Sequence, residues 1–354
     1  MTTLAFPRLA HPIIQAPMAG GPSTPALAAA VPNAGGLGFL ASGYKSVANV
    51  RAELDALRAL TANAFGLNIF LPSAAPADPA LVQRYAKAIE GEASQRGLRL
   101  GEPRFDDDAW AQKLDLALEY RVPIVSFTFG CPERSVIERL HAHGIAAWVT
   151  VTEVSEARTA AGAGADALVV QGVEAGGHRG SFDDRDGSGE VGLLALLRLC
   201  ARHVSLPLVA AGGIADGAGV AAVLAAGAHA AQIGTAFMCC PEAATKAPHR
   251  AALQTPGAGQ SAGATRLTRA FSGRRARGIV NRFLTEHSGH APSAYPELVH
   301  LTEPLRASGD PELMNLWAGQ AFELAEAVPA AQLIERWSAE ARSAIEHARF
   351  QLPD

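Results

Sequence analysis

The sequence predicts a TIM (β/α)8 barrel with an insertion and a mainly helical C-terminal addition. Eight short apolar segments recur between residues 12 and 237, and each is followed by a loop and a helix-like segment. These segments lack the alternation of half-exposed strands, as is typical of parallel strands buried between helices. A length of 354 residues suits one barrel with additions. An open, doubly wound sheet is the structural alternative, because it shares the same alternation.

The expected strands, in chain order, cover residues 12–18, 35–40, 65–71, 123–129, 145–151, 166–172, 206–213 and 229–237. Between them, the segment SVANVRAELDALRAL begins with Ser46 as a candidate helix N-cap. The segment TEVSEARTAAGAGA carries Ser155 near its start and ends in glycines, which is the start-and-stop pattern of a helix. The small residues of ADGAGVAAVLAAGAHA suit a helix that packs closely against a sheet.

Two stretches interrupt the alternation. Residues 72–122 begin with PSAAPADP and are too long for one crossover, so they predict an extra helix or loop inserted between the third and fourth strands. After residue 240 the pattern changes again: residues 255–264 predict a flexible loop, and the last segment predicts a helix packed on the barrel. We therefore expect a barrel over 1–240, with its insertion at about 72–122, and a substrate-covering addition over 241–354.

Composition argues against several classes of partner. The net charge is −4, from 30 Lys and Arg against 34 Asp and Glu, which gives no electrostatic case for nucleic acid or an anionic membrane. One local basic cluster is expected to be a solvated or ligand-facing surface: Arg266, Arg269, Arg274, Arg275, Arg277 and Arg282.

The chain also lacks the usual signals of export and of metal binding. Its N-terminus does not resemble a signal peptide, and no apolar stretch approaches the about 20 residues of a membrane span. The four cysteines show no CxxC spacing, so neither a zinc site nor a disulfide framework is indicated. We expect a cytoplasmic protein with no metal ligands, a monomer or a homodimer.

In a TIM barrel the active site lies where the strands end, so the residues there are informative. The seventh expected strand ends in Gly212 and Gly213, and the eighth contains Gly234 and Thr235. Such turns expose backbone N–H groups, and the N-terminus of a following helix favours an anion, so these two loops predict a phosphate site. Tight packing of helix on strand is the alternative, since it also requires glycine.

Three amides lie at or near other strand ends: Asn68, Gln171 and Gln232. Each can both donate and accept hydrogen bonds, which suits the edge of a flavin ring without adding charge. A single amide of this kind is more often a buried group that bonds to backbone. Their convergence on one face therefore indicates a flavin whose phosphate binds in the glycine turns.

Long motifs resemble those of the nitronate monooxygenases, once called 2-nitropropane dioxygenases, of class I. They include QAPMAGGPSTPALAAAVPNAGGLGFLASGY, GLNIF, SFTFGCP, TVTEVSEARTAAGAGADALVVQGVEAGGHRGSF, AAGGIADGAGVAAVLAAGAHAAQIGTAF, SGRRARGIVNRF and NLWAGQ, in order over nearly the whole chain. The resemblance implies non-covalent FMN, no metal, and oxidation of alkyl nitronates by O2 to a carbonyl compound and nitrite. Propionate 3-nitronate is the substrate that it suggests.

Residue by residue, the resemblance makes His178 the catalytic base. It implies that Met18 lies against the flavin ring and that the other contacts to FMN come from Asn68, Gln171, Gly176, Gly212, Gly213, Gln232, Ile233, Gly234 and Thr235. An imidazole suits proton removal from the carbon of a nitroalkane near neutral pH. His178 would therefore deprotonate a neutral nitroalkane, or bind a preformed nitronate as imidazolium, while Gly176 and Gly177 let the loop approach the flat cofactor.

Several neighbouring residues have expected roles of other kinds. Glu174 is expected to cap a helix or pair with a base, and Arg179 to hold its loop by hydrogen bonds. The charged run at 183–186 is expected to face solvent. Thr128 and the C-terminal residues Tyr295 and Arg306 are candidates to line or cover the pocket, and Trp317 is expected in the core.

Other functions remain open at this point. A flavin-dependent enoyl-(acyl carrier protein) reductase shares the EAGGH loop, and an NADH:quinone reductase is a further possibility. A non-catalytic flavin-binding barrel would need no intact GGHRG motif. An aldolase or epimerase would usually place a lysine or metal-binding acids at strand ends, whereas Lys45, Lys87, Lys113 and Lys246 lie outside the expected strands.

Overall fold

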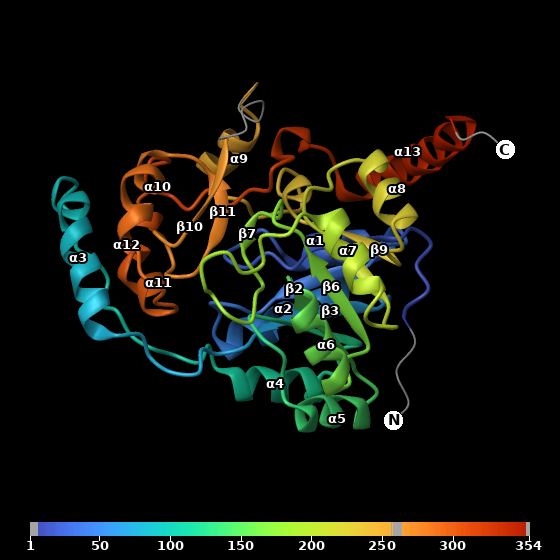
Figure 1. Cartoon of the computed structure of the whole chain (residues 1–354), viewed down its shortest axis with the longest axis horizontal. Coiled ribbons are helices and arrows are strands. Elements are labelled where there is room, and N and C mark those ends of the chain that lie inside the picture. Colours follow the sequence, from blue (N-terminus) through green and yellow to red (C-terminus); the bar gives the residue numbers. More distant parts are fainter. Residues whose placement is uncertain (1–5, 256, 258–263, 352–354) are drawn as a thin grey trace.

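The computed structural model describes residues 6–255, 257 and 264–351, and its centre is a barrel of eight parallel strands (Figure 1). The strands follow one another around the sheet in the order β1, β9, β8, β6, β5, β4, β3, β2. β1 and β2 close the ring: the Gln15 N–H donates to the Leu37 carbonyl at 2.9 Å, and the Leu37 N–H donates to the Ile13 carbonyl at 3.1 Å. The predicted TIM barrel is confirmed, and the alternative of an open sheet is wrong.

Each predicted apolar segment overlaps one strand of the barrel. The strands are β1 (Ile13–Gln15), β2 (Gly38–Ala41), β3 (Phe65–Phe70), β4 (Ile124–Thr128), β5 (Ala146–Val151), β6 (Ala167–Gln171), β8 (Leu208–Ala211) and β9 (Ala230–Ile233). The first, seventh and eighth segments were predicted too long, because the chain leaves the sheet early after β1, β8 and β9. Met18, predicted at the end of the first strand, therefore lies in the loop after β1.

Helices cover the outside of the barrel: α1 (Pro25–Asn33), α2 (Val47–Leu60), α4 (Trp110–Glu119), α5 (Arg134–Ala142), α6 (Val154–Ala163), α7 (Leu193–Ala201) and α8 (Gly217–Ala225). Ser46 caps α2 as predicted, since its hydroxyl accepts the Asn49 N–H at 3.2 Å. α6 begins just before Ser155, with Glu153 in the capping position, and ends at the left-handed Gly164. In the described part of the chain, no helix is both long and apolar enough to span a bilayer.

The last helix of the chain, α13 (Ala330–Gln351), completes the outer layer. It packs against α8 and also against α1, and Figure 1 shows it beside α8. The Trp337 ring is buried and meets Phe237 at 5.2 Å between centroids. The two helices approach so closely that a Cβ on Gly217 would lie 2.2 Å from the Cβ of Glu340. The outer layer of the barrel thus includes a segment from far beyond residue 240.

A second lobe combines the insertion with the C-terminal addition. Within 72–122, α4 belongs to the outer layer of the barrel, and α3 (Pro79–Ser94) is the extra helix. α3 packs against α11 (Glu297–Leu301) and α12 (Glu303–Ala307), at the left of Figure 1. Tyr85 of α3 is buried in the same hydrophobic cluster as Phe271 and Leu298. The insertion therefore supplies one wall of a small core that the sequence did not predict.

The addition contains strands as well as helices. Besides α9 (Ala247–Leu253), α10 (Arg282–His287) and the 3-10 turns η2 (Ser288–His290) and η3 (Phe322–Leu324), it forms the antiparallel strands β10 (Thr265–Thr268) and β11 (Ala276–Ile279). The edge of β11 that does not contact β10 pairs with β7 (Gly177–His178), so that Ala276 lies opposite His178. This sheet joins the addition to the loop after β6. Most of the loop predicted at 255–264 lies outside the described residues.

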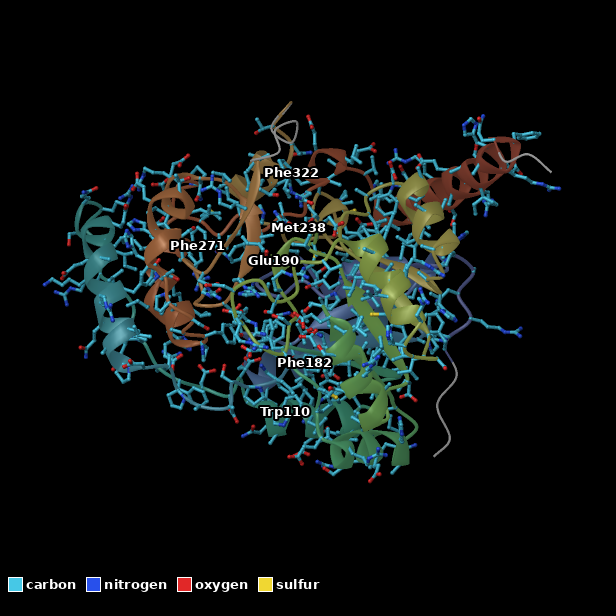
Figure 2. The ribbon with its side chains drawn as sticks, viewed as in Figure 1. Trp110, Phe182, Glu190, Met238, Phe271 and Phe322 are labelled. Atoms are coloured by element: carbon cyan, nitrogen blue, oxygen red, sulfur yellow. The ribbon has the colours of Figure 1, made fainter. Side chains whose placement is uncertain are left out.

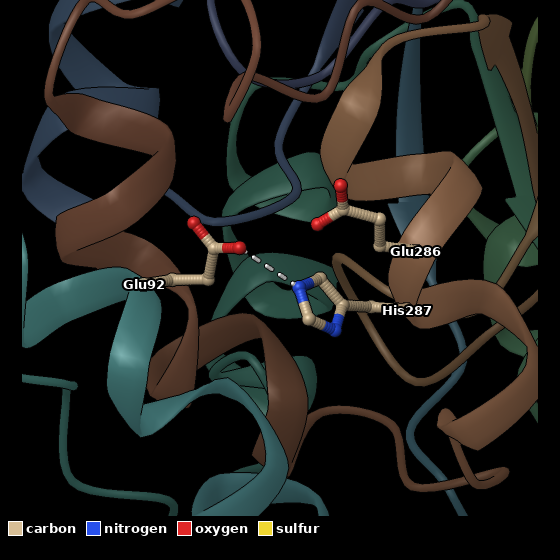
Figure 3. A group of neighbouring side chains, drawn as sticks. All are labelled: Glu92, Glu286 and His287. Atoms are coloured by element: carbon tan, nitrogen blue, oxygen red, sulfur yellow. Dashed lines mark hydrogen bonds and ion pairs between the residues drawn. The ribbon is translucent and has the colours of Figure 1, made fainter.

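An ion-pair network ties α3 to α10. Glu92 accepts hydrogen bonds from both terminal nitrogens of Arg282, at 2.6 and 2.7 Å, and from Arg96 at 3.1 Å. His287 also contacts the Glu92 carboxylate, at 3.1 Å, and Glu286 lies nearby (Figure 3). Two carboxylates and an imidazole could bind a metal ion, but here guanidinium groups already occupy both oxygens of Glu92. The cluster is an electrostatic link between the two parts of the lobe.

This link gives a prediction for stability. Hydrogen bonds from Arg282 hold the pKa of Glu92 at about 2, so the carboxylate stabilises the fold above the pKa of the unfolded group and loses that effect as the pH falls toward 2. We expect Glu92→Gln to lower the free energy of unfolding by about 1–3 kcal/mol at pH 7, measured by urea denaturation.

The control is Glu286→Gln, which removes the more exposed partner of the same arginine and should cost less than about 0.5 kcal/mol. The difference between wild type and Glu92→Gln should shrink below about pH 4.5. Equal effects of the two substitutions at pH 7 would contradict the assignment.

Candidate active site

A cavity of about 280 Å³ opens at the mouth of the barrel, where the strands end, and a second of about 500 Å³ adjoins it. The first is lined by Met18, Asn68, Gln171, Gly176, His178, Gly212, Gly213, Gln232, Gly234 and Thr235, all of them predicted. Figure 2 labels two further lining residues, Met238 after β9 and Phe271 before β11.

Ile233 is the predicted residue that the structure does not bring to the cavity. Its side chain is buried in the core cluster between sheet and helices. Successive side chains of a strand point to opposite faces, so Gln232 points into the barrel mouth and Ile233 points away from it. The predicted contact between Ile233 and the cofactor therefore stays a prediction, and the Ile233 backbone would make it.

His178 lies in the wall of the cavity and is enclosed by aromatic rings. Its ring centroid is 5.6 Å from that of Phe129, 5.9 Å from Tyr295 and 5.5 Å from Trp317. All three contacts are edge-to-face, an arrangement that aromatic rings favour and that restricts rotation of the imidazole. These rings come from the loop after β4 and from two places in the C-terminal addition.

Ser272 determines which nitrogen of His178 carries the proton. The Ser272 hydroxyl donates to the Arg274 carbonyl at 3.1 Å, and its oxygen lies 2.9 Å from Nε2 of His178. A hydroxyl has one hydrogen, so with this one committed the oxygen must accept from an Nε2–H. The neutral imidazole therefore keeps its lone pair on Nδ1, where it can accept a proton.

The surroundings of His178 oppose its protonation. Burial, followed by the positive charges of Arg274 and Arg306, lowers the pKa of His178 to about 3, although Asp184 acts in the opposite direction. A neutral imidazole therefore predominates at pH 7. This argues against the expectation that His178 binds an anion as imidazolium, and it also makes the neutral imidazole a weaker base.

The segment that carries His178 is anchored by Arg179, as predicted. The guanidinium is buried and donates to the carbonyls of Gly172, Gln171 and Gly189 at 2.6, 2.8 and 2.8 Å. Gln171 adds to this anchor, since its Nε2 donates to the His178 carbonyl at 3.2 Å and its Oε1 accepts the Gly180 N–H at 2.8 Å. Gln171 therefore positions the histidine segment, which leaves little of its amide for a ligand.

Phe129 adopts a backbone conformation that a bulky residue rarely takes. Its φ is +78°, in the left-handed region, immediately after β4. The ring packs on Phe70 at 4.5 Å, and the guanidinium of Arg274 lies 4.2 Å above it. Strain of this kind is concentrated at functional sites, where the surrounding contacts maintain it. Here the left-handed backbone of Phe129 accompanies the contact of its ring with His178.

The two glycines that were predicted to form a turn after β8 both have positive φ angles. Gly212 has a φ of +112° and Gly213 a φ of +69°. A Cβ on Gly212 would lie 3.0 Å from Ala175, so close packing contributes to the requirement as well. Gly176 lines the cavity and also allows close approach of the C-terminal addition, since a Cβ there would lie 2.4 Å from the Gly319 nitrogen.

Carboxylates of the protein already cap the helix N-termini near these turns. Asp216 accepts the Gly219 N–H of α8 at 2.7 Å, and Glu340 accepts the Gly217 N–H at 2.9 Å. Glu174 accepts the Leu193 N–H of α7 at 3.0 Å, as its predicted capping role requires. These carboxylates already bond to N–H groups at the starts of α8 and α7, so the predicted phosphate site rests mainly on the loop amides at 212–213 and 234–235 and stays a prediction.

The other polar groups of the cavity have identifiable partners. The Asn68 Nδ2 donates to Ser126 Oγ and Thr128 Oγ1, each at 3.0 Å, which directs its other amide atom to the cavity. Thr128 lines the cavity, as expected. The Thr235 hydroxyl accepts the Gly319 N–H at 3.0 Å and keeps its own hydrogen for a ligand. Uncharged donors and acceptors therefore surround this part of the cavity.

The charged run at 183–186 does not face solvent throughout. The Asp184 side chain is only 7% exposed and pairs with Arg269 at 2.7 Å and Arg275 at 3.1 Å. Its neighbours Asp183, Arg185 and Asp186 are exposed, as predicted.

The predicted arginine surface is also wrong for its central members, because Arg274, Arg275 and Arg277 are buried. Arg277 donates to the Val173 carbonyl at 2.9 Å, and Arg274 to the Arg179 carbonyl at 3.4 Å. These arginines connect the addition to the loop after β6.

Several functional candidates were missed by sequence reasoning. Tyr44 and Phe129 follow β2 and β4, so the rule that singled out strand ends would have found them. Ser272 and His249 lie in the addition, where no local pattern marks them. Trp317 was expected in the core, but it lines the cavity.

A closed TIM barrel with a polar and aromatic cavity at the ends of its strands defines a TIM-barrel enzyme. A family model described as Nitronate monooxygenase matches residues 5–340. A Nitronate monooxygenase of Paraburkholderia phytofirmans is 41% identical over 349 residues, covering 96% of this chain and 94% of its own. One of Pseudomonas aeruginosa is 43% identical over 337 residues, covering 92% and 94%.

Solved structures agree with this assignment. A nitroalkane oxidase from Streptomyces ansochromogenes has 48% identity and a TM-score of 0.91, over 96% of this chain and 98% of that one. FabK from Thermotoga maritima has 28% identity and a TM-score of 0.76, over 97% and 96%. The chain belongs to the nitronate monooxygenase family, a family of oxidoreductases that act on small molecules.

The hydrogen bond to Ser272 gives a prediction about His178 itself. In ¹⁵N NMR spectra of the protein at pH 6–7, His178 should be neutral, with the proton on Nε2 and a lone pair on Nδ1. Ser272→Ala should remove the preference for this tautomer while the ring stays neutral. An imidazolium signal from His178 at pH 6 would show that the buried arginines do not control its charge.

Proposed function

We propose that this chain is an FMN-dependent nitronate monooxygenase that oxidises alkyl nitronates with O2 to a carbonyl compound and nitrite, with His178 as the base. The observation that carries the proposal is the position of His178. A neutral imidazole with a free Nδ1 lies in the wall of a cavity that is also lined by glycine turns of positive φ and by uncharged amides.

The residues of the cavity fit a flavin nucleotide. The amides of the turns at 212–213 and 234–235, together with the Thr235 hydroxyl, would hold the phosphate. Asn68 and Gln232 would contact the polar edge of the ring, and Met18 its face. FMN supplies the electron acceptor of the reaction, and the protein supplies binding, orientation and the base.

His178 would act only on substrates that still carry the proton. Its Nδ1 lone pair accepts a proton from the carbon next to the nitro group, while Ser272 and the surrounding rings hold the imidazole in place. A preformed nitronate has already lost that proton and needs only to be bound. The likeness to a nitroalkane oxidase supports including neutral nitroalkanes among the substrates.

The alternatives, an enoyl-(acyl carrier protein) reductase or an NADH:quinone reductase, would require hydride transfer from a nicotinamide cofactor. The likeness to FabK is lower in identity and in TM-score than the likeness to the nitroalkane oxidase. The family model and the curated relatives also favour nitronate oxidation.

Replacing His178 separates the two kinds of substrate. We expect His178→Asn to lower the rate with a neutral nitroalkane by about 100-fold or more, because proton removal loses its base. The rate with the preformed nitronate should stay within about 10-fold of wild type, since that reaction needs no base. Stopped-flow measurements on both substrates test this, with the exposed His143→Asn as the control. Equal losses on both substrates would refute the role of base.

A glycine of the cavity tests the cofactor site without backbone strain. A Cβ on Gly234 would lie 3.6 Å from the Cβ of Ala16 and 3.8 Å from the Met18 sulfur, which is ordinary contact distance. Gly234→Val should therefore fold, but its methyl groups would occupy the cavity and lower FMN affinity by about 10-fold or more, as FMN titration of the apoprotein would show.

The matched control is Gly91→Val, at a helical glycine with no atom near the built Cβ. It should leave FMN affinity unchanged. Unaltered FMN binding by Gly234→Val, in a protein that melts near the wild-type temperature, would place the cofactor elsewhere.

A further inference from the structure

We propose that Asp184 is a positioning residue, which fixes the imidazole of His178 by holding both ends of the turn that carries Ser272. This inference deepens the proposed function and rests on it, because the orientation of the imidazole matters there for proton removal. It begins from a buried carboxylate that lines neither of the two cavities and has no part in the proposed reaction.

The turn at residues 269–275 joins β10 to β11 and presents Ser272 to the imidazole. The Arg269 carbonyl accepts the Ser272 N–H at 3.2 Å, so the backbone couples Ser272 to the start of the turn. The Ser272 oxygen in turn lies 2.9 Å from Nε2 of His178. Movement of the Arg269 end of the turn would therefore move the Ser272 hydroxyl relative to the ring that it orients.

The carboxylate of Asp184 bonds to both ends of this turn. One oxygen accepts the Arg269 Nε–H at 2.7 Å, and the other accepts the Arg275 Nε–H at 3.1 Å and the Arg275 backbone N–H at 3.2 Å. The Asp184 carbonyl also accepts a hydrogen bond from a terminal nitrogen of Arg269 at 2.6 Å. Hydrogen bonds between charged groups are the strong ones, so a single aspartate ties the first and last residues of the turn to the loop after β7.

Burial distinguishes these contacts from the surface ion pairs around them. Only 7% of the Asp184 side chain is exposed, against 15% for Arg269 and 6% for Arg275. Arg269 also pairs at 2.7 Å with Asp186, whose side chain is 89% exposed. Arg275 also pairs at 2.9 Å with the half-exposed Glu190, which Figure 2 labels. Water screens the exposed pairs, whereas loss of the buried carboxylate would leave uncompensated charge, so Asp184 is the partner that fixes the two arginines.

The same carboxylate contacts the segment that supplies one of the rings around His178. The Ser293 hydroxyl donates to Asp184 at 3.3 Å, and two residues later the Tyr295 ring packs edge-to-face on the imidazole. The N–H of Ala294, between them, donates to a carbonyl of the turn at 2.9 Å. Asp184 therefore connects the turn that orients the imidazole with the segment that encloses it.

The charge of Asp184 also acts on the imidazole itself. Burial and the positive charges of Arg274 and Arg306 lower the pKa of His178, whereas the charge of Asp184 raises it. Loss of that charge would lower the pKa of His178 further and make the imidazole a still weaker base. The contacts and the charge of Asp184 therefore act in the same direction, because both favour proton removal by Nδ1.

A spectroscopic measurement tests the inference without depending on turnover. In ¹⁵N NMR spectra of the holoenzyme at pH 7, wild type should show His178 with its proton on Nε2 alone. Asp184→Asn keeps the shape of the side chain and removes its charge, so the turn should loosen and signals of both tautomers should appear. A His178 spectrum of Asp184→Asn identical to that of wild type would overturn the inference.

A kinetic comparison separates positioning from general stability. We expect Asp184→Asn to lower kcat with 1-nitropropane by about 10- to 100-fold, because proton removal depends on the placement and strength of the base. The kcat with propane-1-nitronate should change by less than about 3-fold, since that substrate has already lost the proton. FMN affinity should stay at the wild-type value. Equal losses on both substrates would mean that Asp184 only stabilises the fold, which would overturn the inference.

Asp186→Asn and Glu190→Gln are the matched controls, because each removes the exposed carboxylate partner of one of the two arginines. Both should leave the spectrum of His178 and the ratio of the two rates unchanged. Changes in these controls as large as those in Asp184→Asn would show that no special role belongs to the buried carboxylate.

A milder variant tests the same link if Asp184→Asn does not fold. Arg269→Met frees one end of the turn and keeps the carboxylate, so both tautomers of His178 should again appear. A wild-type spectrum of His178 in Arg269→Met would then overturn the inference. The predicted changes of the spectrum, in a protein whose wild type oxidises neither substrate, would overturn only the proposed function.

Discussion

The pairing of β7 with β11 is the contact on which the candidate site depends. The barrel alone brings strand ends to one mouth, but it does not determine what lies over that mouth. β11 aligns Ala276 with His178, and the same segment supplies Ser272 and Arg274, which orient the imidazole and keep it neutral. Arg179 ties the other side of the segment to the loop after β6. The loop after β6 and the C-terminal addition therefore build one site.

Charge is distributed around this site in a consistent way. The arginines that join the addition to the barrel are buried and bond to carbonyls and to Asp184, so they serve the architecture. Their positive field reaches the cavity and opposes a charged imidazole. Uncharged amides and hydroxyls line the cavity together with the glycine turns, and two cationic side chains, Lys246 and Arg306, line both cavities.

The parts of this arrangement that repeat along the chain could be predicted from the sequence. Parallel strands are short apolar segments and their ends meet at one edge, so Asn68, Gln232 and the glycine turns could be placed together. Contacts between distant segments leave no such pattern. Nothing local marks α3 as a partner of α11, or Trp317 as a wall of the cavity. The Ile233 side chain lies in the core and not at the cavity, because successive side chains of a strand alternate between its two faces. The buried arginines Arg274, Arg275 and Arg277 were expected at a surface, because the sequence does not show which backbone carbonyls accept their hydrogen bonds.

The central claim is that a flavin lies across the mouth of the barrel, within reach of substrate bound at His178. The most direct test is the absorbance spectrum of the holoenzyme, mixed without oxygen first with a nitronate and then, in a separate sample, with NADH. The account predicts flavin bands that the nitronate bleaches within a single turnover and that NADH leaves unchanged. A colourless protein that cannot be loaded with FMN, or flavin bands that NADH bleaches and the nitronate does not, would contradict it.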